Sequence, residues 1–102
     1  MTTWIHACRA GDIDEEDLVR WDHNGKSYAI YNTPSGFYCT DGYCTHEKQH
    51  LEDGFVDGTI IECPLHQGRF NIVTGRALSA PVCVNLGTYE VEVRQGEVFV
   101  LV

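Results

Sequence analysis

Two short cysteine–histidine pairs constrain this chain of 102 residues more than any other feature. Cys44-Thr45-His46 and Cys63-Pro64-Leu65-His66 are separated by 16 residues, positions 47 to 62. Each segment offers one thiolate and one imidazole, and both groups bind metals once they are deprotonated. The pattern therefore predicts a fold in which two loops face each other across a metal centre.

The choice and order of ligands favour an iron–sulfur centre over the alternatives. Thiolates suit iron–sulfur clusters, and two imidazoles in place of two thiolates on one iron remove negative charge and raise the reduction potential. Zinc is the competing metal, but common Cys2His2 zinc sites place the two cysteines together and then the two histidines. Four unligated loop residues are the third alternative, which requires two Cys/His pairs at short spacing by chance.

Strand signals dominate the rest of the chain. Asn24-Gly25 favours the positive φ angles of a tight hairpin turn, and Gln95-Gly96 marks a second turn near the C-terminus. No long stretch carries a helical period, and the acidic residues 12–17 are interpreted as a solvated connection. The pattern predicts an all-β fold, a small antiparallel sandwich or barrel. The expected strands are residues 18–21, 26–31, 37–41, 59–62 and 89–94, with a more fully buried strand at 98–102.

The metal-binding pattern interrupts these strands in two places. Residues 42–54 and 63–68 are rich in Cys, His and Gly, and a hairpin that contains the strand 59–62 joins them. We expect the two loops to lie side by side at one end of a sheet, as a cluster-binding subdomain. The chain length predicts one domain over residues 1–102.

Charge and composition exclude several classes of partner. Seven basic and fifteen acidic residues give a formal charge of -8, which disfavours binding to nucleic acids and anionic membranes. The longest apolar run, residues 98–102, cannot span a bilayer, and no secretory signal is found, so a cytoplasmic protein is expected. Five cysteines without a signal argue against a disulfide framework. Cys8, Cys39 and Cys83 are interpreted as packing residues.

The paired motifs resemble those of Rieske iron–sulfur proteins. The similarity extends through Leu51-Glu52-Asp53-Gly54, His66-Gln67-Gly68-Arg69-Phe70-Asn71 and Thr74-Gly75 to the alternating valines near the C-terminus. It covers nearly the whole chain and leaves no room for a catalytic domain. The chain looks most like the small ferredoxins that supply electrons to aromatic-ring-hydroxylating dioxygenases.

This resemblance implies a cofactor, a ligand set and partners. One 2Fe–2S cluster is expected, with Cys44 and Cys63 on an inner iron and His46 and His66 on an outer iron near solvent. The protein would be a monomeric electron carrier and not an enzyme. It would take single electrons from a flavin-dependent reductase and pass them to the Rieske centre of a terminal oxygenase. The alternatives are a small Rieske subunit of a nitrite reductase-like complex and a structural zinc interaction module.

Departures from the high-potential members of the family refine the expectation. Those proteins carry a disulfide between the two cluster loops, but this chain has Leu65 in the second loop and no cysteine at positions 47–50. Their Ser and Tyr hydroxyl donors correspond here to Gly68 and Phe70, which cannot donate such bonds to sulfur. Fewer hydrogen bonds to the cluster lower its potential, so a value of roughly -150 mV is predicted.

Other residues near the two Cys/His motifs have candidate roles in docking or in shaping the loops. Glu47, Glu52 and Asp53 are candidate docking charges, and an electron-transfer rate independent of salt would count against that role. His50 is interpreted as a solvated loop histidine, and a part in docking or in proton uptake coupled to reduction is the alternative. Three glycines, Gly42, Gly54 and Gly68, are either plain turn residues or positions where backbone amides point at cluster sulfurs.

Overall fold

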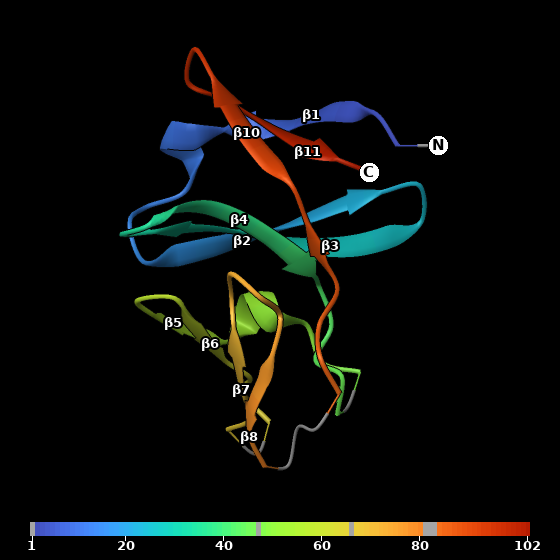
Figure 1. Ribbon diagram of the computed structural model, residues 1–102, viewed down its shortest axis with the longest axis vertical. Helices are drawn as coiled ribbons and strands as arrows, with labels where there is room; N and C mark the ends of the chain where they lie inside the picture. Colours follow the sequence, from blue (N-terminus) through green and yellow to red (C-terminus); the bar gives the residue numbers. More distant parts are fainter. Residues whose placement is uncertain (1, 47, 66, 81–83) are drawn as a thin grey trace.

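The computed structural model describes residues 2–46, 48–65, 67–80 and 84–102, and within these the chain forms three antiparallel sheets (Figure 1). The first sheet has the strand order β1-β11-β10, the second β2-β3-β4-β9 and the third β5-β6-β7-β8. The predicted all-β antiparallel class is confirmed. The strands are β1 (Trp4–Arg9), β2 (Asp17–His23), β3 (Lys26–Thr33), β4 (Gly36–Asp41), β5 (Phe55–Asp57), β6 (Ile60–Glu62), β7 (Arg69–Asn71), β8 (Ala77–Ser79), β9 (Thr88–Tyr89), β10 (Val91–Arg94) and β11 (Glu97–Leu101).

The three sheets form layers, with the second sheet in the middle (Figure 1). One apolar core lies between the first and second sheets and includes Ile30, Cys39 and Val98. A second core joins the middle sheet to the third sheet, which carries the two predicted loops. The third sheet and the described parts of the two predicted loops therefore form one unit that packs against the central sheet.

The β2–β3 hairpin shows how the sequence specifies this framework. Asn24 and Gly25 have φ angles of 49° and 76°, as the tight turn between two paired strands requires. The pairing continues over seven residue pairs from His23–Lys26 to Asp17–Asn32, so both strands are longer than predicted. This hairpin supplies two of the four strands of the central sheet.

The C-terminal strands differ from the prediction in two respects. The expected strand 89–94 is divided into β9 and β10, which belong to different sheets. β11 is not buried throughout: Val98 and Val100 are fully buried, while Phe99 on the opposite face is half-buried. The first sheet is packed on one face only, so apolar residues alternate between core and surface.

Several elements have no clear signal in the sequence. β5, β7 and β8 have only three residues each, too few for an alternating pattern to be recognised. A 3-10 turn at Ala10–Asp12 leads into the acidic segment. Residues 14–16 of this segment are exposed as predicted, but Ile13 is buried. A second 3-10 turn, Leu51–Asp53, lies in the first cluster loop. No helix within the described ranges is long and apolar enough to cross a membrane.

Candidate metal centre

The first loop, residues 42–54, leaves β4 and is closed at its base by backbone pairing. Tyr43 and His50 form an antiparallel bridge, and their rings pack with centroids 4.3 Å apart. The Cys44 N–H donates to the Gln49 carbonyl (2.9 Å), and the Leu51 N–H donates to the Gly42 carbonyl (2.9 Å). These contacts fix the backbone on both sides of the Cys44-Thr45-His46 segment.

The second loop, residues 63–68, is the connection of the β6–β7 hairpin. Glu62 and Arg69 pair at its base, and their side chains form an ion pair with 3.0 Å between Nε and Oε1. The Cys63 N–H donates to the Gly68 carbonyl at 2.7 Å. Gln67 has a φ of 57°, which allows the chain to turn within six residues. Both loops are thus hairpin-like segments held at their bases.

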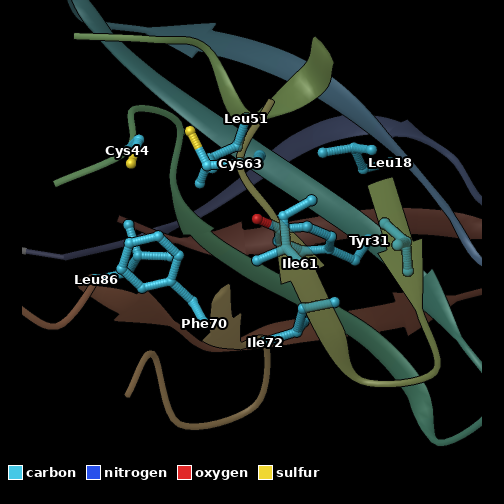
Figure 2. Packing of buried hydrophobic residues seen from close by; sticks show 11 residues of the cluster. Leu18, Tyr31, Cys44, Leu51, Ile61, Cys63, Phe70, Ile72 and Leu86 are labelled. Carbon is cyan, nitrogen blue, oxygen red and sulfur yellow. The ribbon is translucent and has the colours of Figure 1, made fainter. Parts of the chain in front are cut away.

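The two cysteines lie in one buried cluster. Cys44 is 5% exposed and Cys63 is fully buried, and both pack in the core that joins the second and third sheets. Figure 2 shows Cys44 at one end of this cluster, with Leu86 and Phe70 nearby. His46, two residues after Cys44, is exposed. The structure therefore separates buried sulfur donors from a solvent-facing imidazole.

The predicted fourth ligand, His66, lies outside the described residues. Within the described ranges, no group of three or more His, Cys, Asp and Glu side chains converges on a single metal-binding point. A 2Fe–2S cluster divides its ligands between two iron atoms, so its donors need not converge in this way. Buried thiols from one loop pair and an exposed imidazole have the chemistry that such a cluster requires.

A returning segment, Val84–Gly87, closes the site beside the first loop, and we call it the strap. Thr45 Oγ1 donates a hydrogen bond to the Val84 carbonyl (2.6 Å), and the Leu86 N–H donates to the Gly75 carbonyl (2.7 Å). The Leu86 side chain is buried in the same core as the two cysteines. The strap is thus held against both the first loop and the third sheet.

Asp41, the last residue of β4, connects the strap to the central sheet. Its N–H donates to the Gly87 carbonyl (2.9 Å), and its Oδ2 accepts from the Gly87 N–H (2.8 Å). Its Oδ1 accepts from the Tyr89 hydroxyl (2.5 Å) and lies 3.1 Å from Lys26 Nζ. Lys26 Nζ also donates to the Tyr89 hydroxyl at 2.6 Å. We call Lys26, Asp41 and Tyr89 the carboxylate network.

The network shifts the titration of all three groups. Burial tends to raise the pKa of Asp41, but hydrogen bonds from Tyr89, Gly87 and Lys26 outweigh it and lower the pKa. The hydrogen bond with Tyr89, assisted by Asp41, raises the pKa of Lys26. Burial and the hydrogen bond to Asp41 raise the pKa of Tyr89. The ion pair therefore stays charged at neutral pH.

The predicted glycines have a packing role. A Cβ atom at Gly42 would lie 2.7 Å from Ser27 Oγ, and one at Gly54 would collide with the Glu62 carbonyl. The Gly42 N–H donates to Ser27 and the Gly54 N–H to Leu51. Close backbone packing therefore requires glycine at positions 42 and 54. That the three glycines let loop amides point at cluster sulfurs stays a prediction.

Other predicted residues have mixed outcomes. His50 is half-buried and packs on Tyr43, so it is part of the loop base and not a fully solvated residue. Glu52 and Asp53 are exposed, although Glu52 lies 3.7 Å from Arg20 and Asp53 accepts a hydrogen bond from Gln49. The packing role of two other cysteines is confirmed: Cys39 is buried and Cys8 packs against the same core. Glu47 and Cys83 lie outside the described residues.

Comparison with known proteins identifies the family. Residues 3–90 match the sequence profile of the Rieske [2Fe-2S] domain. The chain belongs to the Rieske [2Fe-2S] family. The ferredoxin component of the naphthalene 1,2-dioxygenase system of Pseudomonas putida is 43% identical over 97 residues, which cover 95% of this chain and 93% of that protein.

Solved structures agree with this membership. In the complex of reduced oxygenase and oxidized ferredoxin in carbazole 1,9a-dioxygenase, one chain matches with a TM-score of 0.90 and 42% identity, covering 95% of this chain and 91% of that chain. A putative nitrite reductase small subunit from Mycobacterium tuberculosis has a TM-score of 0.87 but 17% identity, over 100% of this chain and 96% of its own. That likeness shows the fold alone.

Family membership confirms the main expectations from sequence. This Rieske protein carries one 2Fe–2S cluster and belongs with the ferredoxin components of aromatic dioxygenase systems. It is an electron carrier and not itself an enzyme. The strap and the carboxylate network were not predicted from the sequence. Their contacts join residues up to 63 positions apart, and no local pattern marks them.

Proposed function

We propose that Cys44, His46, Cys63 and His66 hold the cluster and that the chain carries single electrons to the Rieske centre of a terminal ring-hydroxylating oxygenase. A flavin-dependent reductase would supply the electrons. The cluster itself provides one-electron redox chemistry when bound. The residues of this chain hold it, exclude water from its inner side and present its outer side to partners.

The difference in burial between the cysteines and His46 carries this proposal. Cys44 and Cys63 are at most 5% exposed and lie among apolar side chains, whereas His46 is exposed at the tip of the first loop. Cys44 and Cys63 would hold the cluster from the protein interior and His46 from the surface, where a docked partner could exchange electrons with it. His66 is proposed for the equivalent place in the second loop because its motif is the counterpart of the first.

The surface around His46 suits transient docking. Val84, on the strap beside Thr45, is 59% exposed, so an apolar side chain lies next to the loop that carries His46. Glu52 and Asp53 add exposed negative charge in the same loop. Complementary charge speeds encounter, and exposed apolar groups allow short-lived contact. The complex between oxygenase and ferredoxin formed by a related protein supports the proposed partner.

The surroundings of the second loop support a low reduction potential. Gly68 has no side chain, and Phe70 is fully buried without a hydroxyl group. Neither residue can donate a side-chain hydrogen bond that would stabilise a reduced cluster. We therefore place the potential at roughly -150 mV, at the low end of the Rieske range.

We propose a monomeric, single-domain carrier that acts in the cytoplasm. A role as a nitrite reductase subunit has only a likeness in fold to support it. A structural zinc module is disfavoured because the chain belongs to a 2Fe–2S family.

Substitution of the proposed ligands tests this function. Cys63→Ser should abolish the Rieske-type electron paramagnetic resonance signal of the reduced protein and stop electron transfer to the oxygenase. His46→Cys should replace the Rieske-type signal with that of a cluster whose reduction potential is lower, because a thiolate ligand adds negative charge. Cys8→Ser and His6→Gln, which lie on β1 away from both loops, are the matched controls and should keep the signal. An unchanged Rieske signal in Cys63→Ser would refute the ligand assignment.

A further inference from the structure

At the end of β4, the Asp41 side chain replaces a backbone group in the hydrogen bonding between strands. The ladder between β4 and β9 ends at the pair Thr40–Thr88. Asp41 extends it by one residue, because its N–H donates to the Gly87 carbonyl and its own carboxylate accepts from the Gly87 N–H. The side chain thus takes the place of a backbone carbonyl and holds both polar groups of Gly87.

The sequence leaves space for this carboxylate. A Cβ atom at Gly87 would lie 2.8 Å from Asp41 Oδ2 and 3.2 Å from the Tyr89 hydroxyl. Gly75 meets the strap in a similar way, because a Cβ atom there would collide with the Leu86 carbonyl. Glycine at both positions allows the strap to approach Asp41 on one side and the third sheet on the other.

The carboxylate itself is held from two further strands. Tyr89 on β9 donates to Oδ1, and Lys26 on β3 bonds to both the Tyr89 hydroxyl and Oδ1. Lys26 Nζ also lies over the rings of Tyr28 and Tyr89, 5.5 and 5.0 Å from their centroids. A carboxylate with this many fixed partners has one available orientation, so its hold on Gly87 is fixed as well.

The next residue connects this hold to the cysteines. Leu86 is bonded through its backbone to Gly75 and buried in the cluster that contains Cys44, Cys63 and Phe70 (Figure 2). Asp41 also stands three residues before Cys44, at the entry to the first loop. The carboxylate network therefore holds both segments that enclose the Cys44 side of the site.

We propose that Asp41 is a positioning residue for electron transfer: fixed by Lys26 and Tyr89, it holds the strap against the core that contains Cys44 and Cys63, and so would keep water away from a bound cluster. Solvent exposure is one of the factors that set the potential of such a cluster. Reduction adds negative charge, which water stabilises. Loosening the strap should therefore raise the potential. This inference rests on the proposed ligand assignment.

Tyr89→Phe is the most direct test, because it removes the hydroxyl that fixes the carboxylate and leaves every formal charge unchanged. The matched control is Tyr38→Phe, which removes a hydroxyl on β4 whose partner is the Ser35 carbonyl. We expect Tyr89→Phe to raise the midpoint potential beyond the scatter of repeated titrations, and Tyr38→Phe to leave it unchanged. The Gly87 amide should exchange its hydrogen about tenfold faster in Tyr89→Phe, because the Asp41 carboxylate is no longer held in line with this amide.

Asp41→Asn is a second test variant. It should also raise the midpoint potential and speed hydrogen exchange at the Gly87 amide. Lys26→Arg keeps the charge and the donor and should leave both close to wild type. If Tyr89→Phe and Asp41→Asn lower thermal stability but leave the potential unchanged, the network is only structural and the inference fails. If the wild-type protein shows no Rieske-type signal, the proposed function fails instead, so the two failures can be distinguished.

Discussion

At the scale of single residues, Asp41 illustrates how a polar group can be partly buried without loss of stability. Its side chain is 31% exposed, and its two carboxylate oxygens accept from a hydroxyl, a backbone amide and an ammonium group. Hydrogen bonds to a charged acceptor contribute more than neutral ones, but partial exposure and screening reduce the gain. We estimate the net contribution of this carboxylate at about 1 kcal/mol.

The lowered pKa of Asp41 predicts how this contribution depends on pH. The folded-state pKa lies below the value of about 3.9 expected in the unfolded chain. The carboxylate therefore stabilises the fold fully above that value, and its contribution is lost as the pH falls through the folded-state pKa. The difference in unfolding free energy between wild type and Asp41→Asn should be constant from about pH 7 to 5 and shrink below about pH 4.

Urea unfolding of both proteins, followed by circular dichroism across this range, measures that difference. The other carboxylates are common to the two proteins, so their titration cancels in the comparison. A difference that stays constant down to about pH 3 would show that the Asp41 carboxylate does not contribute through its charge.

Local motifs made some residues predictable, and distance in sequence hid others. Cys44 and Cys63 were predicted as metal ligands because each belongs to a short Cys/His pattern, and the resemblance to Rieske proteins implied their place on the inner side. Asp41 could not be found in this way, since its partners Lys26 and Tyr89 lie on strands whose association with β4 depends on the whole fold. His50 was interpreted as solvated. Its packing on Tyr43 arises only when the folded loop brings the two residues together, and no sequence pattern indicates that contact.

At the scale of elements, the β2–β3 hairpin depends on its turn. Gly25 has a φ of 76° and open space around its Cα, so an added methyl group would meet no neighbour but would strain the backbone. Gly25→Ala should lower the free energy of unfolding by about 1 kcal/mol. Chemical denaturation monitored by circular dichroism measures this change.

Gly11 is the matched control for that substitution. It also has open space around it, but its φ lies outside the left-handed region, so alanine can adopt its conformation without strain. Gly11→Ala should be neutral or slightly stabilising. Equal destabilisation by the two substitutions would show that the left-handed turn is not the cause.

The elements that the sequence predicted are those with a local signal. The hairpin turn and the alternating valines identified β2, β3 and the C-terminal strands, although their ends shifted by one or two residues. No bounds were predicted for β1, because the extent of Trp4–Arg9 as a strand depends on its pairing with β11 at the opposite end of the chain. The three-residue strands of the third sheet are held by their loops and by the core beneath them.

At the scale of the whole molecule, only one of the two cores includes the proposed ligands. The core between the first and second sheets contains neither of the predicted cysteine ligands and consists mostly of apolar strand residues. The core beneath the third sheet includes Cys44 and Cys63, so the residues that stabilise this half also surround the proposed inner ligands. Loss of the cluster is therefore expected to destabilise the third sheet more than the sandwich.

A redox titration of the isolated protein, followed by electron paramagnetic resonance, tests the central claim most directly. We predict one Rieske-type signal that grows on reduction with a one-electron slope of about 59 mV per tenfold change in ratio. Its midpoint should lie at roughly -150 mV. A colourless protein without such a signal would contradict the proposed cluster and its ligands. A midpoint above zero would contradict the low-potential environment inferred from Gly68 and Phe70.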